Sequence, residues 1–217
     1  MPTFATLQER PVVRAALSLP LRGAWTARLL VDTDKPLEGA VTLATNEGAV
    51  RFEGWVARGG VAHGRLEALL VGGRGGLARR LPARSYRSIP ARLVLQALLS
   101  EAGESLASTS EAELLDQQLP HWTRLEAPTS VNLDRLCTAL GARWRVDRAG
   151  QVLVTRATAS PASASRGERL EDAPSESSRF YALELLDLEP GTTFDGLAVC
   201  AVEHEIAPSR IRTRVWA

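Results

Sequence analysis

Residues 66–77 have the sequence LEALLVGGRGGL, and the chain changes its architecture there. An apolar run predicts a strand that ends in the glycine-rich break at 72–76. A second predicted strand at 77–86 and an amphipathic helix at 90–102 follow. Nothing in this order of elements is typical of a catalytic motif. We interpret it as a β-barrel that passes the chain to a small α/β module, an order that favours assembly over chemistry.

The residues before this break alternate apolar and polar side chains with the period of two that is typical of half-buried strands. Within 23–32, for example, Trp25, Ala27 and Leu29 share one face. Glycine-containing turns such as Gly59-Gly60 separate the runs. We predict strands at 12–19, 23–32, 39–45, 49–58, 61–71 and 77–86. Six evenly spaced strands without a helical period predict a small antiparallel barrel or sandwich.

The period changes in the next segment. Ser88 or Ile89 is the predicted cap of the helix that Gly103 ends. A shorter helix is expected at 111–118, a strand at 121–125, and a second long helix that Thr129 or Ser130 caps and Gly141 ends. A hairpin of 142–146 and 151–155 follows. The residues of the second long helix expected to face inward are Val131, Leu133, Leu136, Cys137 and Leu140.

The last part of the chain begins with a stretch rich in Ala, Ser, Pro and Glu, which predicts a mobile linker. Strands are expected again at 181–188, 197–206 and 211–216. The predicted domains are a tube-like antiparallel barrel at 1–87, an α/β module at 88–156, a flexible linker at 157–179 and a C-terminal β segment, a partial second barrel, at 180–217. The fold class is therefore mainly β with a small α/β insert.

Composition excludes several classes of protein. No apolar run reaches the roughly 18 residues of a membrane helix, and the first residues lack the pattern of an export signal. Cys137 and Cys200 lie far apart, and we expect both to be reduced and buried. Residues 1–89 hold 13 Lys+Arg against 7 Asp+Glu, or +6, whereas 90–217 hold 13 against 18, or −5. Two solvated surfaces or head-to-tail contact between subunits would each explain this split.

No catalytic, cofactor or metal site is predicted. The glycine-rich stretch lacks the GK[ST] of a phosphate loop and is flanked by strands, so we expect a bulged turn. Glu101 and Glu104 are expected on a solvated helix face, without a setting that would separate their pKa values. The histidines lack ligand spacing. His204 alternates with Glu203 and Glu205 and is interpreted as a surface or interface residue.

The five tryptophans are scattered, which favours core positions or interface anchors over a base-stacking platform. Trp122, Trp216 and His204 are the candidate interface residues.

Three stretches resemble the baseplate hub proteins of contractile phage tails, the late-control-D-like and Mu-type hub family, which is related to the base of type VI spike proteins. The first runs from LVGG at 70–73 through Leu81 and Tyr86 into the helix at 91–103. The second is HWTR at 121–124 with the following helix and hairpin. The third is VCAVEHEI at 199–206, followed by RTRV at 212–215. Their order along the chain carries the resemblance.

The resemblance implies a non-enzymatic hub that joins the tail tube to the central spike as a homotrimeric ring. Tube, spike and other baseplate proteins would be its partners, and DNA would be passing cargo. It would be made in the bacterial cytoplasm and reside in the virion or a tail-like injection particle. The family usually has two barrels, whereas about 38 residues follow the linker here. A carbohydrate- or peptidoglycan-binding module and a tail-associated hydrolase are the alternatives.

Overall fold

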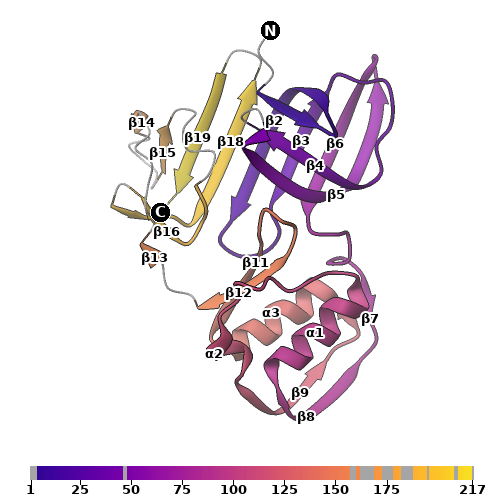
Figure 1. Cartoon of the computed structure of the whole chain (residues 1–217), viewed down its shortest axis with the longest axis vertical. Coiled ribbons are helices and arrows are strands. Elements are labelled where there is room, and N and C mark those ends of the chain that lie inside the picture. Colours follow the sequence, from indigo (N-terminus) through magenta and orange to yellow (C-terminus); the bar gives the residue numbers. More distant parts are fainter. Residues whose placement is uncertain are drawn as a thin grey trace.

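The computed structural model describes residues 4–45, 48–156, 160–161, 169–172, 178–181, 188–194, 196–207 and 210–216. Figure 1 shows a barrel, a helix-containing module at one end of it, and a C-terminal sheet along its side. The prediction of a mainly β fold with a small α/β insert is confirmed.

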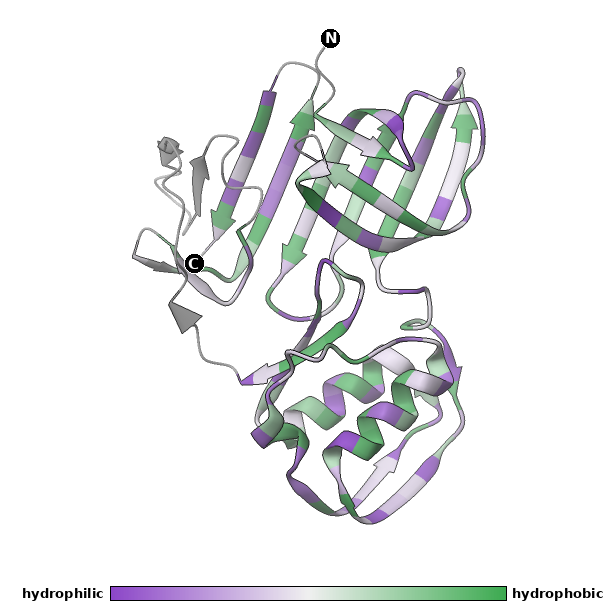
Figure 2. Ribbon diagram, viewed as in Figure 1, coloured by the Kyte–Doolittle hydropathy of each residue, from purple (hydrophilic) through white to green (hydrophobic). Residues whose placement is uncertain are grey.

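Six antiparallel strands close the barrel in the order β1-β4-β5-β6-β3-β2, with β2 pairing back to β1. Figure 2 shows hydrophobic and hydrophilic residues alternating along these strands, as a barrel with a filled interior requires. Leu43, Phe52 and Leu70 point inward and are fully buried. The strands are β1 (Ala5–Leu7), β2 (Arg10–Pro20), β3 (Thr26–Val31), β4 (Gly39–Thr45), β5 (Val50–Ala62) and β6 (Arg65–Gly72).

Two sequence-based assignments in the barrel are wrong. Gly59-Gly60 is not a turn, because β5 continues to Ala62 and the chain reverses at His63 and Gly64. Both turn residues have positive φ (52° and 73°), which suits a two-residue hairpin that follows the strand twist. The sixth barrel strand is β1 and not 77–86, since the strands in that stretch pair within the module.

The module is built from three two-stranded sheets and two long helices. Helices α1 and α3 contact each other and lie beside the β8–β9 ribbon (Figure 1). Pairing joins β8 to β9, β7 to β10 and β11 to β12. The elements are β7 (Arg80–Leu81), β8 (Arg84–Pro90), α1 (Ala91–Ala102), α2 (Ala112–Leu115), β9 (Gln118–Arg124), β10 (Ala127–Pro128), α3 (Thr129–Ala139), β11 (Ala142–Val146) and β12 (Val152–Arg156). The predicted hairpin, the strand near 121–125 and the short helix are thus present.

The helix ends follow the sequence only in part. Gly103 ends α1 in the left-handed region, as predicted. Ser88 and Ile89 do not cap α1. Strand β8 continues to Pro90, and Pro90 is the residue that caps the helix. Thr129 and Ser130 do not cap α3 either, because Pro128 is the cap residue and the Thr129 hydroxyl donates to the Arg79 carbonyl instead. The predicted inward orientation of Val131 is wrong, since 40% of it is exposed.

The C-terminal strands extend the barrel sheet outward. From β2 the order continues β18-β19-β15-β14, and a separate small sheet has the order β13-β16-β17. The strands are β13 (Ser160–Pro161), β14 (Arg169–Asp172), β15 (Ser178–Tyr181), β16 (Thr192–Phe194), β17 (Leu197–Ala198), β18 (Ala201–Ala207) and β19 (Arg210–Trp216). Within the predicted linker, only 160–161, 169–172 and 178–179 are described. Its other residues, and 182–187 of the predicted strand 181–188, lie outside the described part. The division into four domains stays a prediction.

A substitution at Gly72 tests how tightly the barrel packs around Trp25. A Cβ at position 72 would lie 2.5 Å from Trp25 Nε1, and Trp25 is only 1% exposed. We expect Gly72→Ala to lower the free energy of unfolding by about 1–3 kcal/mol in urea denaturation. Gly60→Ala is the control, because its Cβ would meet no atom within 4 Å and should change stability by about 0.5 kcal/mol or less. Equal effects of the two substitutions would contradict this packing.

Candidate functional site

One strand joins the barrel to the C-terminal sheet. β2 pairs with β3 along one edge from Val12 to Ser18. Its other edge is divided, because β1 pairs only with Arg10 and Pro11, whereas β18 pairs with Ala15–Pro20. The two sheets therefore share a continuous hydrogen-bonded ladder, which holds them in a fixed relation.

His204 lies at this shared ladder, opposite Leu17 of β2 and Thr213 of β19. Its side chain is fully buried, so the predicted surface position is wrong. The alternation with Glu203 and Glu205 is confirmed, but the sheet covers the histidine face. Nδ1 is hydrogen-bonded to the Thr213 hydroxyl at 2.9 Å, while Nε2 has no partner among the described residues. Burial, with a smaller contribution from Arg148, lowers the pKa of His204 from 6.5 to about 3.

The tip of the β11–β12 hairpin fastens the module to the barrel. Gly23 donates its N–H to the Trp144 carbonyl at 2.9 Å and accepts from Val146 at 3.0 Å. The indole of Trp25 donates to the Asp147 carbonyl at 3.2 Å, and the N–H of Glu53 donates to the Arg148 carbonyl at 2.7 Å. Apart from the indole bond of Trp25, these bonds connect backbone on both sides, so the contact depends largely on hairpin shape.

The same hairpin contacts the C-terminal segment through ion pairs. Arg145 and Arg148 both bind the carboxylate of Glu189, which lies just before β16. Burial raises the pKa of neighbouring Asp147, although the Gln151 N–H donates to that carboxylate at 2.8 Å. The hairpin is therefore in contact with all three parts of the structure.

The glycine-rich stretch forms a second joint, between the barrel and the end of α1. The Glu104 carboxylate accepts the N–H of Arg74 at 3.0 Å and of Gly76 at 2.7 Å. Glu104 is 6% exposed, so its predicted solvated position is wrong. A Cβ at Gly76 would lie 2.1 Å from the Ala102 carbonyl oxygen, and one at Gly75 would lie 2.7 Å from the Trp55 ring. The loop is a backbone cradle that is already occupied by a carboxylate of its own chain.

Glu101, also expected in solvent, instead neutralises a buried cation. Its carboxylate pairs with Arg124 at 2.8 Å and with Arg84 at 3.0 Å. Arg124 is 1% exposed and donates through Nε to the Pro82 carbonyl at 2.8 Å. The hydrogen bond from Arg124 is the main reason that the pKa of Glu101 is lowered. These ion pairs hold α1 to the β8–β9 ribbon.

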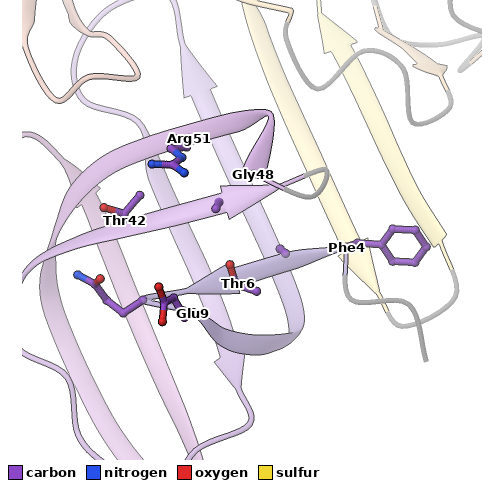
Figure 3. Close-up of a pocket in the computed structure, with 9 residues that line it drawn as sticks. Phe4, Thr6, Glu9, Thr42, Gly48 and Arg51 are labelled. Carbon is purple, nitrogen blue, oxygen red and sulfur yellow. The ribbon is translucent and has the colours of Figure 1, made fainter.

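A shallow hollow of about 440 Å³ lies over β1, β4 and the start of β5. Figure 3 shows Thr6, Thr42 and Arg51 along these strands, with the Phe4 ring pointing away from the Glu9 end. The described residues that line it include no histidine, cysteine or serine. The described residues also contain no group of three or more His, Cys, Asp or Glu that could hold a metal ion. No helix of the described part is long and apolar enough to cross a membrane.

The fold is similar to solved structures of phage tail proteins. The 43 kDa tail protein of prophage MuSo2 from Shewanella oneidensis has a TM-score of 0.70 at 9% identity, covering 98% of this chain and 95% of that chain. A tail protein from Neisseria meningitidis MC58 has a TM-score of 0.62 at 10% identity, with 98% and 95% covered. The chain has a tail-protein fold.

The fold is also similar to that of a protein from a secretion apparatus. An Escherichia coli component of the type VI secretion system, described as structurally similar to the T4 tail proteins gp27 and gp5, has a TM-score of 0.67 at 10% identity, with 97% of this chain and 75% of that chain covered. No family model and no curated protein matches this sequence. The similarity is thus one of fold, carried by strand arrangement rather than by identical residues.

The candidate interface residues are placed in three different settings. Trp122 is 7% exposed and packs beside Tyr86, with ring centroids 5.9 Å apart. His204 is buried at the shared ladder. Trp216 is half-buried, with the Arg214 guanidinium 4.6 Å from its ring centre. Of the three, Trp216 therefore has the most surface to offer a partner, and the interface role stays a prediction.

The two cysteines also differ. Both are free thiols, but only Cys137 is buried, and burial raises its pKa to about 12. Cys200 is exposed, so its predicted burial is wrong. It lies between β17 and β18.

Glu104 provides a test of the glycine-rich joint. We expect Glu104→Gln to lower the free energy of unfolding by about 1–3 kcal/mol, because the buried N–H of Gly76 and the partly buried N–H of Arg74 lose their charged acceptor. Glu113→Gln is the control, since the Glu113 side chain is 82% exposed and its ion pair with Arg156 should contribute little. Chemical denaturation of both variants checks this, and an unchanged midpoint for Glu104→Gln would contradict the proposed cradle.

His204 predicts a dependence of stability on pH. Its pKa is lower in the folded protein than in the unfolded chain, so the unfolded chain binds the proton more readily. The stability from neutral His204 is present above pH 6.5 and is lost as the pH falls toward about 3. This residue should contribute a slope of up to about 1.4 kcal/mol per pH unit in that window. His204→Gln should flatten the curve, whereas exposed His121→Gln should leave it unchanged.

Proposed function

We propose that this chain is a non-enzymatic hub component of a phage tail baseplate or tail-like contractile injection device, joining the tail tube to the central spike. The observation that carries the proposal is the arrangement of barrel, module and C-terminal sheet, which matches that of tail proteins over nearly the whole chain. The similarity to a type VI component described as resembling gp27 and gp5 favours a position near the spike. Such a protein resides in the virion or the tail-like particle after synthesis in the bacterial cytoplasm.

The hub assembles with itself and with its neighbours, the tail tube, the spike and other baseplate proteins, while DNA passes as cargo. A homotrimeric ring is the proposed assembly. The C-terminal sheet ends, within the described residues, at β14, which has one paired edge. An unpaired strand edge is a template for strands of another chain, so it supports assembly. Trp216 is the proposed anchor, because it is partly exposed on β19, which belongs to the same sheet as β14.

Neither alternative function has a comparable observation in its favour. A sugar-binding groove needs solvent-facing aromatic side chains, and the 37% exposed Trp55 instead packs on Gly39 and Gly75. A hydrolase needs a nucleophile with a base or paired carboxylates. The buried carboxylate of Glu104 is occupied by backbone N–H groups, and that of Glu101 is occupied by arginines.

Mass in solution tests the proposed assembly. The purified full chain should have three times its 23.4 kDa mass in native mass spectrometry and light scattering. Trp216→Ala should shift the trimer toward monomer, because an interface loses its aromatic anchor. Leu93→Ala on α1 is the matched control, since Leu93 is an exposed apolar residue far from β19 in the chain. A wild-type protein that stays monomeric alone and with the tube and spike proteins would overturn the ring.

A further inference from the structure

A second concave surface lies on the outer wall of the barrel, away from the joints described above. It has a volume of about 880 Å³ and crosses β2, β3, β6 and the end of β5. We name it the arginine groove and define it by Arg14, Arg28, Leu30, Arg58, Gly60 and Leu69.

Strand register places these side chains on one face. Arg28 of β3 lies opposite Leu69 of β6, which in turn lies opposite Arg58 of β5. The next row contains Arg14 and Leu30, followed by Glu67 and Gly60. Arginines and apolar side chains therefore alternate across the wall, and the apolar residues form a floor between cations.

No ion pair among the described residues neutralises the arginines of the groove. Arg14, Arg28 and Arg58 are exposed, and none has an ion pair or side-chain hydrogen bond to another described residue. Glu67 is the single carboxylate among the residues that line the groove. Three cations against one anion leave a surface that favours acidic ligands.

Gly60 is a residue that the fold itself does not require. It lies inside β5, and its φ is outside the left-handed region that favours glycine. A Cβ there would meet nothing within 4 Å. Glycine weakens a strand, and inside one it often marks the place where another backbone approaches closely. At the end of the groove Gly60 therefore leaves the backbone of β5 without a side chain over it.

We propose that the arginine groove binds an extended acidic segment of another protein, in which carboxylates alternate with apolar side chains. The carboxylates pair with Arg14, Arg28 and Arg58, the apolar side chains cover Leu30 and Leu69, and the backbone of the segment passes over Gly60. Glu67 and the apolar floor disfavour a nucleic-acid backbone, which presents phosphates without apolar side chains. The inference goes beyond the tail role and rests on the chemistry of the groove alone.

Fluorescence anisotropy with short labelled probes tests the proposal on the full chain. The probes are a peptide of alternating glutamate and leucine, its lysine-for-glutamate twin and a duplex DNA. The acidic peptide should bind with a Kd below about 1 mM, more weakly as salt rises, and the lysine peptide should not bind. An Arg14→Glu/Arg28→Glu double variant should weaken binding about tenfold or more.

Gly60→Val separates the groove from folding. It should also weaken binding about tenfold or more without lowering stability, because its side chain enters open space in the groove. Arg51→Glu is the charge control, since Arg51 is exposed on β5 outside the groove and should leave binding intact.

Any of these results would overturn the proposal. The first is no binding of the acidic peptide, or binding that Gly60→Val leaves unchanged. The second is tighter binding of DNA than of the peptide, with the same sensitivity to the arginine substitutions. The third is self-association of the wild-type chain that Gly60→Val abolishes, which would make the groove a contact between copies.

Discussion

The structure depends on how one edge of β2 is divided between two partners. Gln8 and Glu9, both with positive φ, form a tight turn that brings β1 against β2 for only two residue pairs. The barrel is closed by that short contact together with the β1–β4 pairing. Because β1 occupies so little of the edge, Ala15–Pro20 remain for β18. The position of the C-terminal sheet, the burial of His204 and the place of Glu189 beside the hairpin tip all follow from this division.

The contact between the barrel and α1 combines glycine backbone, which has no side chains, with a buried carboxylate. Gly75 and Gly76 allow Trp55 and the end of α1 to approach within distances that a side chain would block. The N–H groups that this backbone exposes need an acceptor, and Glu104 supplies it. A glycine-rich loop of the kind that elsewhere cradles phosphate here holds a carboxylate from the same chain. The loop is therefore a structural joint, which agrees with the lack of a phosphate motif in its sequence.

Local patterns predicted the elements better than they predicted the contacts. Alternating residues such as Trp25, Ala27 and Leu29 identify a strand, and Gly103 identifies a helix end, because both signals act within a few residues. The pair Gly59-Gly60 was wrongly predicted to be a turn. Both residues lie inside β5, so a turn conformation is not the reason for the two glycines. Glu104 was predicted in solvent and His204 at the surface or an interface, because their partners, the loop at 73–76 and Thr213, are brought close only by the tertiary fold. Ser88 was mistaken for a helix cap because β8 extends to Pro90, and nothing in the sequence marks that extension.

The shared ladder also constrains the order in which the chain can fold. Pro20 pairs with Ala201 and Ala15 pairs with Ile206, so the partners are more than 180 residues apart in sequence. The barrel strands are all synthesised by residue 72, and most of their pairings are local. During translation β2 therefore presents an open edge until the last strands emerge from the ribosome. Contacts so distant in sequence form slowly. The nascent chain thus passes through a stage in which its barrel is formed and the β2 edge, which could pair with strands of other chains, is still uncovered.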